Sequence, residues 1–298
     1  MSTPEHKSYY GRPILKEPVW KPEVAWYLFT GGLSGALSGL GFAARLSGNE
    51  VLARRALTLA GTVAAANPVL LVTDLGRPLR FLNMLRVFKV TSPMSVGSWI
   101  VAAHGTTSGI STGCELLGIL PRTRTLANGA AAALGLGMST YTGALVADTS
   151  IPVWHEARRE LPFVFASGAA MTAGAAAAAV TPARDARPAR LLALMGAAGE
   201  LANLWAMERR LGALIGEPYH EGPSGRYGTL GKRLTLAGTA VLAVAGRKRA
   251  GAVGGGALLL AAGALTRWSV FKAGFASARD PKYTVVPQRE RVESRAAG

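Results

Sequence analysis

Long uncharged blocks separated by short basic loops are the feature that most restricts how this chain folds. Five long runs carry no Asp, Glu, Lys or Arg, and three later runs are shorter or adjoin a charge. A bilayer core needs about 20 apolar residues per crossing helix. We therefore expect an all-α, polytopic transmembrane bundle of about eight helices, with spans at residues 24–44, 56–73, 90–114, 125–147, 161–183, 191–207, 234–246 and 250–266.

Other architectures fit less well. Only 17% of the residues are charged, against about 25% in soluble domains. The runs do not alternate apolar and polar residues with period two, which argues against a barrel. The seventh run has only 13 residues, a length that also suits a re-entrant segment. It reaches membrane length only if Lys232 and Arg233 extend their charged ends to the interface, so its full crossing stays open.

Charge and composition divide the chain into three regions. Residues 1–23 are expected to form an extended, proline-containing segment that docks a partner, and residues 24–272 the transmembrane domain. Residues 273–298 are expected to form a polar, basic tail that is disordered over residues 279–298. The formal net charge is +16. Because the basic residues sit at the ends of apolar blocks, they indicate membrane flanks rather than a nucleic-acid surface.

Eight spans place both termini on one side, which we call the terminal face. This face carries 21 of the Lys and Arg residues and the opposite face 11, but without the two tails the numbers are equal. The positive-inside rule then places the terminal face in the cytoplasm on the strength of the tails alone. The expected location is the cytoplasmic membrane.

Four polar groups inside or next to the spans are candidates for function, because ionisable residues in a membrane are costly. Asp74 ends the second span, His104 lies in the third, Tyr141 in the fourth and Glu200 in the sixth. As a proton relay, Asp74, His104 and Glu200 transfer protons by general acid–base chemistry, and Tyr141 donates a hydrogen bond to a carbonyl oxygen.

Each candidate also has a structural alternative. Asp74 caps a helix or pairs with Arg77 or Arg80, His104 packs in the core, and Glu200 is neutralised by a partner. Tyr141 anchors at the interface. Glu115 is expected to be an interface carboxylate, and the charged run at residues 155–160 a solvated loop. Glycines 31, 35 and 39 and the Ala/Gly run 168–179 indicate close helix packing or, with equal weight, genomic base composition.

Composition limits the cofactors. A b-type haem in a helical bundle usually needs two axial histidines, and only His104 lies in a span, so we expect neither haem nor a metal site. One cysteine, Cys114, cannot hold an iron–sulfur cluster. Any such cluster belongs to a partner subunit.

Three stretches resemble the NrfD-like family, the membrane subunits of polysulfide-reductase-type complexes. They are DLGRPLRFLNMLRVFKVTSPMSVGSWI (74–100), YYGRPILKEPVWKPEVAWYLFTGGLSG (9–35) and TYTGALVADTSIPVW (140–154), within a similarity that runs from about Tyr9 to Lys272. The resemblance implies a subunit of an anaerobic respiratory oxidoreductase that exchanges electrons between menaquinone or another quinone and a ferredoxin-like [4Fe–4S] partner. A molybdopterin subunit is connected through that partner.

The resemblance also implies site residues. Tyr141 matches the family's quinone-contacting tyrosine and Asp74 its loop aspartate, whereas Tyr27 falls near a position where the polysulfide-reductase type has a quinone-contacting histidine. Partner docking is expected at the N-terminal segment and the loop near residue 154, through Tyr10, Arg12, Trp20, Trp154, His155 and Arg158.

Two other function classes stay open. A stand-alone proton-coupled transporter also suits buried Asp, His and Glu, but no internal repeat is evident between residues 24–147 and 161–271. A passive membrane anchor has no need of Glu200 or His104.

Overall fold

The computed structural model describes residues 14–75 and 80–296, and this part of the chain is α-helical with no strand. Short 3₁₀ turns, η1 (Ala157–Arg159) and η2 (Glu217–Tyr219), connect some of the helices. The helices are α1 (Pro22–Leu46), α2 (Glu50–Ala64), α3 (Ala66–Asp74), α4 (Arg80–Met84), α5 (Pro93–Leu117), α6 (Pro121–Ala147), α7 (Pro152–Glu156), α8 (Leu161–Val180), α9 (Arg187–Gly216), α10 (Gly222–Ala245), α11 (Arg249–Arg279) and α12 (Lys282–Ala296).

The eight expected spans correspond to α1, α2–α3, α5, α6, α8, α9, α10 and α11. Four of these segments are long and apolar enough to cross a membrane by length and composition: Glu50–Asp74, Pro121–Ala147, Leu161–Val180 and Arg249–Arg279. The predicted all-α membrane bundle is therefore confirmed. The second span is broken between Ala64 and Ala66, just before Pro68, which cannot donate a backbone hydrogen bond.

The seventh span is longer than its apolar run suggested. Helix α10 has 24 residues, a length of roughly 36 Å at 1.5 Å per residue. Lys232 lies near its middle and pairs with Glu208 of α9, with Nζ 2.5 Å from Oε1. Residues 222–233 lengthen the helix beyond the apolar run, and Glu208 of the neighbouring helix compensates the charge of Lys232 within it.

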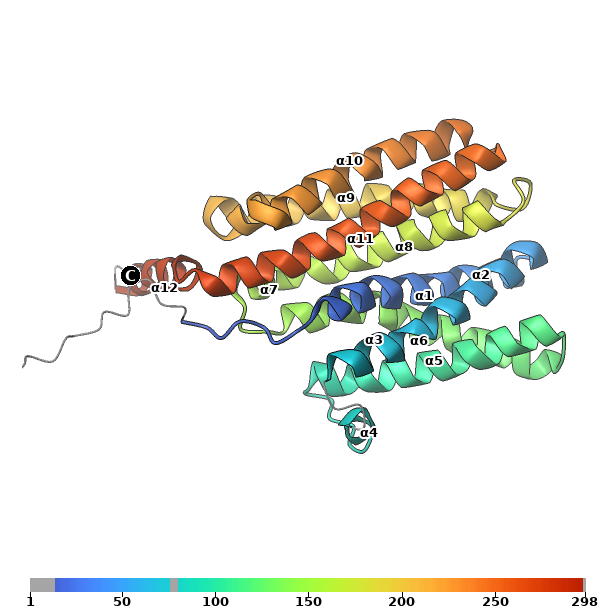
Figure 1. Cartoon of the computed structure of the whole chain (residues 1–298), viewed down its shortest axis with the longest axis horizontal. Helices are drawn as coiled ribbons and strands as arrows, with labels where there is room; N and C mark the ends of the chain where they lie inside the picture. The colour runs from blue at the N-terminus through green and yellow to red at the C-terminus, as the bar shows by residue number, and fades with distance from the viewer. Residues whose placement is uncertain (1–13, 76–79, 297–298) are drawn as a thin grey trace, which may run out of the picture.

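The long helices form two groups that lie side by side (Figure 1). The first group contains α1, α2–α3, α5 and α6, and the second contains α8, α9, α10 and α11; α8 packs against both α1 and α6. Within the first group α1 and α6 meet backbone to backbone, because a Cβ on Gly35 would lie 2.4 Å from the carbonyl oxygen of Gly135. Gly39, by contrast, has no neighbour within 4 Å of such a Cβ.

Both ends of the chain approach the same end of the bundle. Arg279, at the end of α11, pairs with Glu17 of the N-terminal segment at 2.8 Å. Helix α11 continues seven residues beyond the expected boundary at Lys272, and α12 follows it. The prediction of a disordered tail was wrong for residues 282–296, because the buried Tyr283 and Lys282 bind Glu217 and hold α12 against the bundle.

Candidate functional site

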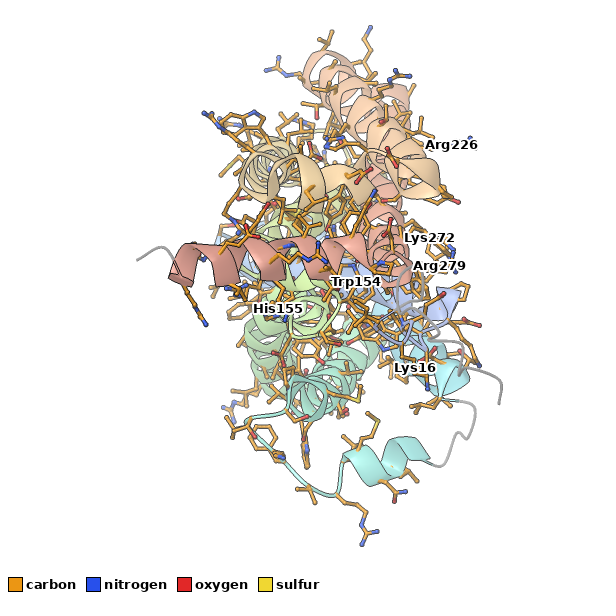
Figure 2. The ribbon with its side chains drawn as sticks, turned by 90° about the vertical axis from the view of Figure 1, so that its left-hand side faces the viewer. Lys16, Trp154, His155, Arg226, Lys272 and Arg279 are labelled. Carbon is orange, nitrogen blue, oxygen red and sulfur yellow. The ribbon has the colours of Figure 1, made fainter. Side chains whose placement is uncertain are left out.

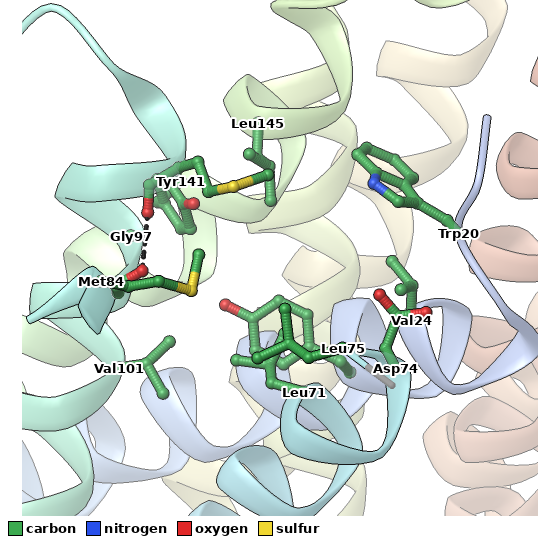
Figure 3. Close-up of a pocket in the computed structure, with 13 residues that line it drawn as sticks. Trp20, Val24, Leu71, Asp74, Leu75, Met84, Gly97, Val101, Tyr141 and Leu145 are labelled. Atoms are coloured by element: carbon green, nitrogen blue, oxygen red, sulfur yellow. Dashed lines mark hydrogen bonds between the residues drawn. The ribbon is translucent and has the colours of Figure 1, made fainter. Parts of the chain in front are cut away.

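A pocket opens at the terminal face of the first helix group (Figure 3). The space between its walls, including the open mouth, is about 590 Å³. Its walls come from the N-terminal segment, α1, α3, α4, α5 and α6. The lining residues are Trp20, Val24, Tyr27, Leu71, Asp74, Leu75, Met84, Met94, Gly97, Ser98, Val101, Tyr141 and Leu145.

Tyr141 reaches the pocket because α5 has no side chain in its way. A Cβ on Gly97 would lie 1.7 Å from the Tyr141 hydroxyl oxygen and 1.8 Å from its Cζ, so the phenol lies directly against the α5 backbone. Among the described residues the Tyr141 hydroxyl has no hydrogen-bond partner, and the side chain is half-buried. It is therefore a free donor at the pocket wall.

Gly97 is a residue that the sequence analysis did not select. Helix interiors disfavour glycine by roughly 1 kcal/mol, but α5 also contains Gly105, Gly109 and Gly113, where an added Cβ would have no neighbour within 4 Å. A glycine in this helix therefore does not by itself indicate a close neighbour, and only the fold identifies Tyr141 as the neighbour of Gly97.

Asp74 lies at the end of α3 and closes another side of the pocket (Figure 3). Its Oδ1 accepts a hydrogen bond of 2.9 Å from the backbone N–H of Lys21, the residue before α1, and the Lys21 ammonium donates to the carbonyl of Thr73 at 3.3 Å. Asp74 thus fastens the entry of α1 while lining the pocket. Arg77 and the side chain of Arg80, its suggested partners, are outside the described part of the structure.

Tyr27 and Trp20 complete the aromatic part of the wall. Tyr27 is fully buried, and its hydroxyl makes no hydrogen bond within the described residues. Trp20 stacks on Trp154, with ring centroids 5.3 Å apart and planes at 22°. The structure therefore brings Asp74, Tyr27 and Tyr141, which are far apart in sequence, to one cavity.

His104 lies outside the pocket. It is one turn of α5 beyond the pocket residue Val101 and is 1% exposed. Its Nδ1 is 3.2 Å from the carbonyl oxygen of Ala131, and since a carbonyl only accepts, Nδ1 carries the proton. The Ser108 hydroxyl is 3.5 Å from the ring. These contacts match the packing alternative.

Glu115 is a carboxylate buried within the protein, two residues before the end of α5. It is 4% exposed, and its Oε1 lies 2.7 Å from Nη2 of Arg45. Asn128 donates to the same oxygen at 3.3 Å, and Ser111 donates to Asn128 at 2.6 Å. This network ties α1, α5 and α6 together at the opposite face.

Glu200 also lies away from the pocket, in the second helix group. It pairs with Arg267 of α11 at 3.4 Å, and both side chains are buried. The Arg267 guanidinium also donates to the carbonyl of Phe165 at 2.8 Å and stacks 4.1 Å from that ring. A Cβ on Gly168 would lie 2.2 Å from the Glu200 carboxylate. The partnered alternative thus describes Glu200.

The expected docking residues differ in their exposure, and Figure 2 labels two of them, Trp154 and His155. His155 and Arg158 are exposed at the terminal face. The prediction of Trp154 as a docking residue was wrong, because its side chain is fully buried and its indole N–H donates to the carbonyl of Val270 at 2.7 Å. Trp20 is half-buried against it, and Tyr10 and Arg12 lie outside the described residues.

A second hollow adjoins these docking residues. It encloses about 650 Å³ and lies between the N-terminal segment, the loop after α6, α7 and α12. Its lining includes Leu15, His155, Glu156 and Tyr283. The N-terminal segment therefore borders both hollows at this face.

About two thirds of the chain matches a known protein family. Residues 15–217 match the family model described as Polysulphide reductase, NrfD. The match includes every residue that lines the first pocket and ends before α10, α11 and α12. No curated protein matches the chain.

Proposed function

Because the chain belongs to the polysulphide reductase NrfD family, we propose that it exchanges electrons between a membrane quinone and an iron–sulfur partner subunit. The family supplies the membrane subunit of polysulfide-reductase-like oxidoreductases. The observation that carries the proposal is the meeting of Tyr27, Asp74 and Tyr141 in one apolar pocket at the end of the bundle.

The pocket suits a quinone ring in shape and chemistry. Its wall is largely Leu, Val, Met and aromatic surface, which favours burial of an apolar ring. The two phenols have no hydrogen-bond partner among the described residues, and unpaired buried donors are costly. A quinone carbonyl oxygen within reach of Tyr141 satisfies one of them, and Asp74 is the pocket's carboxylate for proton exchange.

Protons exchanged at the pocket must also move between it and the rest of the bundle. His104 continues the pocket-lining face of α5 by one turn, so it is the candidate next to the pocket. Glu200 is paired with Arg267 in the other helix group. We therefore assign the relay to Asp74 and His104 and leave Glu200 out of it.

The partner is proposed to dock on the terminal face, at the hollow beside His155. The exposed Lys16 and Arg158 add positive charge there, since Lys16 follows the lining residue Leu15 and Arg158 pairs with the lining residue Glu156 at 3.9 Å. Family subunits pair with iron–sulfur and molybdopterin subunits, and a cluster held at this face lies on the same side of the bundle as the pocket. The redox centres themselves belong to those partners.

The test is Tyr141→Phe, which removes one hydroxyl and keeps the ring. Loss of one hydrogen bond of about 1.4 kcal/mol lowers affinity tenfold, so quinone binding and quinone-coupled turnover of the purified complex should fall by roughly that factor. Tyr227→Phe, in α10, is the matched control and should change neither. Unchanged affinity in Tyr141→Phe with intact assembly would remove Tyr141 from the site.

A further inference from the structure

The segment from Leu82 to Trp99, which we call the rim, carries a row of exposed apolar side chains. It consists of the end of α4, a loop and the start of α5, and Figure 1 shows α4 set apart from both helix groups near the pocket end of α5. Fully burying one such side chain is worth about 1.5–3 kcal/mol. The exposed members are Leu82, Val87, Phe88, Val90, Met94 and Trp99.

The charges of the rim all have one sign. Between Leu82 and Trp99 there is no Asp or Glu, and Arg86 and Lys89 are exposed. Apolar and aromatic side chains mixed with basic ones are typical of elements that lie in the interface of a bilayer. Basic residues there interact with anionic headgroups.

The rim is tied to α5 by specific contacts. Ser95 accepts a hydrogen bond from the Lys89 backbone N–H at 3.0 Å and donates one to the carbonyl of Val87 at 3.0 Å. Phe88 and Trp99 pack edge to face, 6.2 Å between centroids. The outward position of the apolar residues is therefore built into the fold.

The inner side of the same segment lines the pocket. Met84 and Met94 contribute to its wall, and Leu71 and Leu75 of the α3 end also line it. On α3 itself Val69 is 62% exposed, so the helix that lines the pocket beside the rim also presents an apolar side chain outward. We propose that the rim is embedded in the lipid leaflet at the terminal face, and that the pocket opens between α3 and the rim into that leaflet.

A bilayer fits this surface better than a protein partner does. The proposed docking region beside α7 and α12 is charged and includes both acidic and basic side chains, among them Glu156 and Arg158. The rim has basic charge only, together with six exposed apolar side chains. The membrane contact stands without the proposed function, whereas the passage of a ligand tail through the opening rests on it.

Site-directed spin labelling tests the membrane contact. Cys114 is the only cysteine, so Cys114→Ser gives a background for Leu82→Cys, Val87→Cys and, as an exposed control on α12, Gln288→Cys. The full chain is reconstituted in phosphatidylglycerol–phosphatidylcholine vesicles. Labels at 82 and 87 should collide with oxygen more than with a nickel chelate, and the label at 288 the reverse. Equal nickel access at 87 and 288 would overturn the proposal.

Two naphthoquinones test the opening. Val87→Glu places a carboxylate in the rim and Val292→Glu places the same change on α12, where Val292 is exposed. Val87→Glu should slow binding of an isoprenoid-tailed menaquinone by roughly tenfold, equivalent to about 1.4 kcal/mol, and leave tailless menadione unchanged. An equal loss for both ligands, or no loss, would overturn the opening. Failure of wild type to bind menadione would instead remove the proposed function and leave the labelling result standing.

Discussion

Two buried polar sites, one in each helix group, differ in how their polar side chains are paired. In the second group Glu200 and Arg267 neutralise each other in a closed site, and Phe165 covers the guanidinium. In the first group the hydroxyls of Tyr27 and Tyr141 face a cavity and have no partner within the described residues. Burying a polar group is costly unless it is paired. A buried polar side chain that is paired within the protein therefore indicates a structural role, whereas an unpaired one beside a cavity indicates ligand binding.

The largest effect is expected from breaking the closed pair. Glu200→Gln leaves the buried Arg267 charge uncompensated, and removing one partner of a buried pair costs about 3–5 kcal/mol. Thermal unfolding in detergent should show a large loss of stability. Glu208→Gln on the same helix, whose pair with Lys232 is partly exposed, should cost at most about 1 kcal/mol.

The double variant Glu200→Gln with Arg267→Met sharpens this result. It removes both charges, so much of the lost stability should return. Quinone affinity measured below the unfolding temperature should match wild type in all these variants. A Glu200→Gln protein with normal stability and no quinone binding would reverse the comparison between the two groups.

The next largest effect is expected from a substitution at the pocket of the first helix group. Gly97→Ala places a methyl group where the Tyr141 phenol lies, since the nearest phenol atom is 1.7 Å from that position. Overpacking of this kind costs about 1–3 kcal/mol, and displacement of the phenol should abolish measurable quinone binding. Isothermal titration with a soluble quinone analogue measures this.

Gly105→Ala is the matched control, because on the same helix its Cβ would have no neighbour within 4 Å. It should bind quinone like wild type, and its helix propensity should make it slightly more stable. Normal quinone affinity in Gly97→Ala would show that the Tyr141 position is unimportant.

Substitutions of Asp74 are expected to have a smaller effect on stability and activity. Its carboxylate both fastens the N-terminal segment and lines the pocket. Asp74→Ala removes the acceptor for the Lys21 amide, a loss of about 1 kcal/mol, and should expose the N-terminal segment to limited proteolysis. Asp74→Asn keeps an oxygen acceptor and should protect that segment. If Asp74→Asn still lowers turnover of the complex while quinone affinity stays normal, the carboxylate acts in proton exchange. Equal turnover in Asp74→Asn and wild type would restrict Asp74 to its structural contact.

The sequence predicted the helices better than it predicted the partners of their polar residues. Uncharged blocks determine where a helix can cross lipid, so all eight long helical segments lie over expected spans. Pairing depends on the azimuth and neighbours of each helix, which hydropathy does not encode. The sequence analysis therefore recognised neither Glu208 as the partner of Lys232 nor Arg267 as the partner of Glu200.

Some residues of the candidate site could likewise be predicted from the sequence, and others could not. Asp74, Tyr27 and Tyr141 were selected from intramembrane polarity and a family resemblance, and the fold brings them together. Gly97 and Met84 were missed, because a missing side chain and a flexible apolar one have no chemical signature in sequence. Trp154 was misassigned because a tryptophan beside a charged loop suits an interface as well as a core, and only packing against α11 separates the two.

The smallest predicted effect is a pH dependence at α12, outside the pocket. The hydrogen bond from Lys282, with a further one from Tyr283, lowers the pKa of Glu217 below its ordinary value of 4.5. A lowered pKa means that the contact is fully present above the ordinary value and is lost as the pH falls through the lowered one. A spin label at Gln288→Cys should therefore stay immobile at neutral pH and become mobile in acid. Lys282→Gln removes the principal donor, so its label should be mobile already at neutral pH and respond less to acid. If the mobility of the label without the Lys282 substitution instead rises from acid to neutral pH, the Glu217 carboxylate does not hold α12.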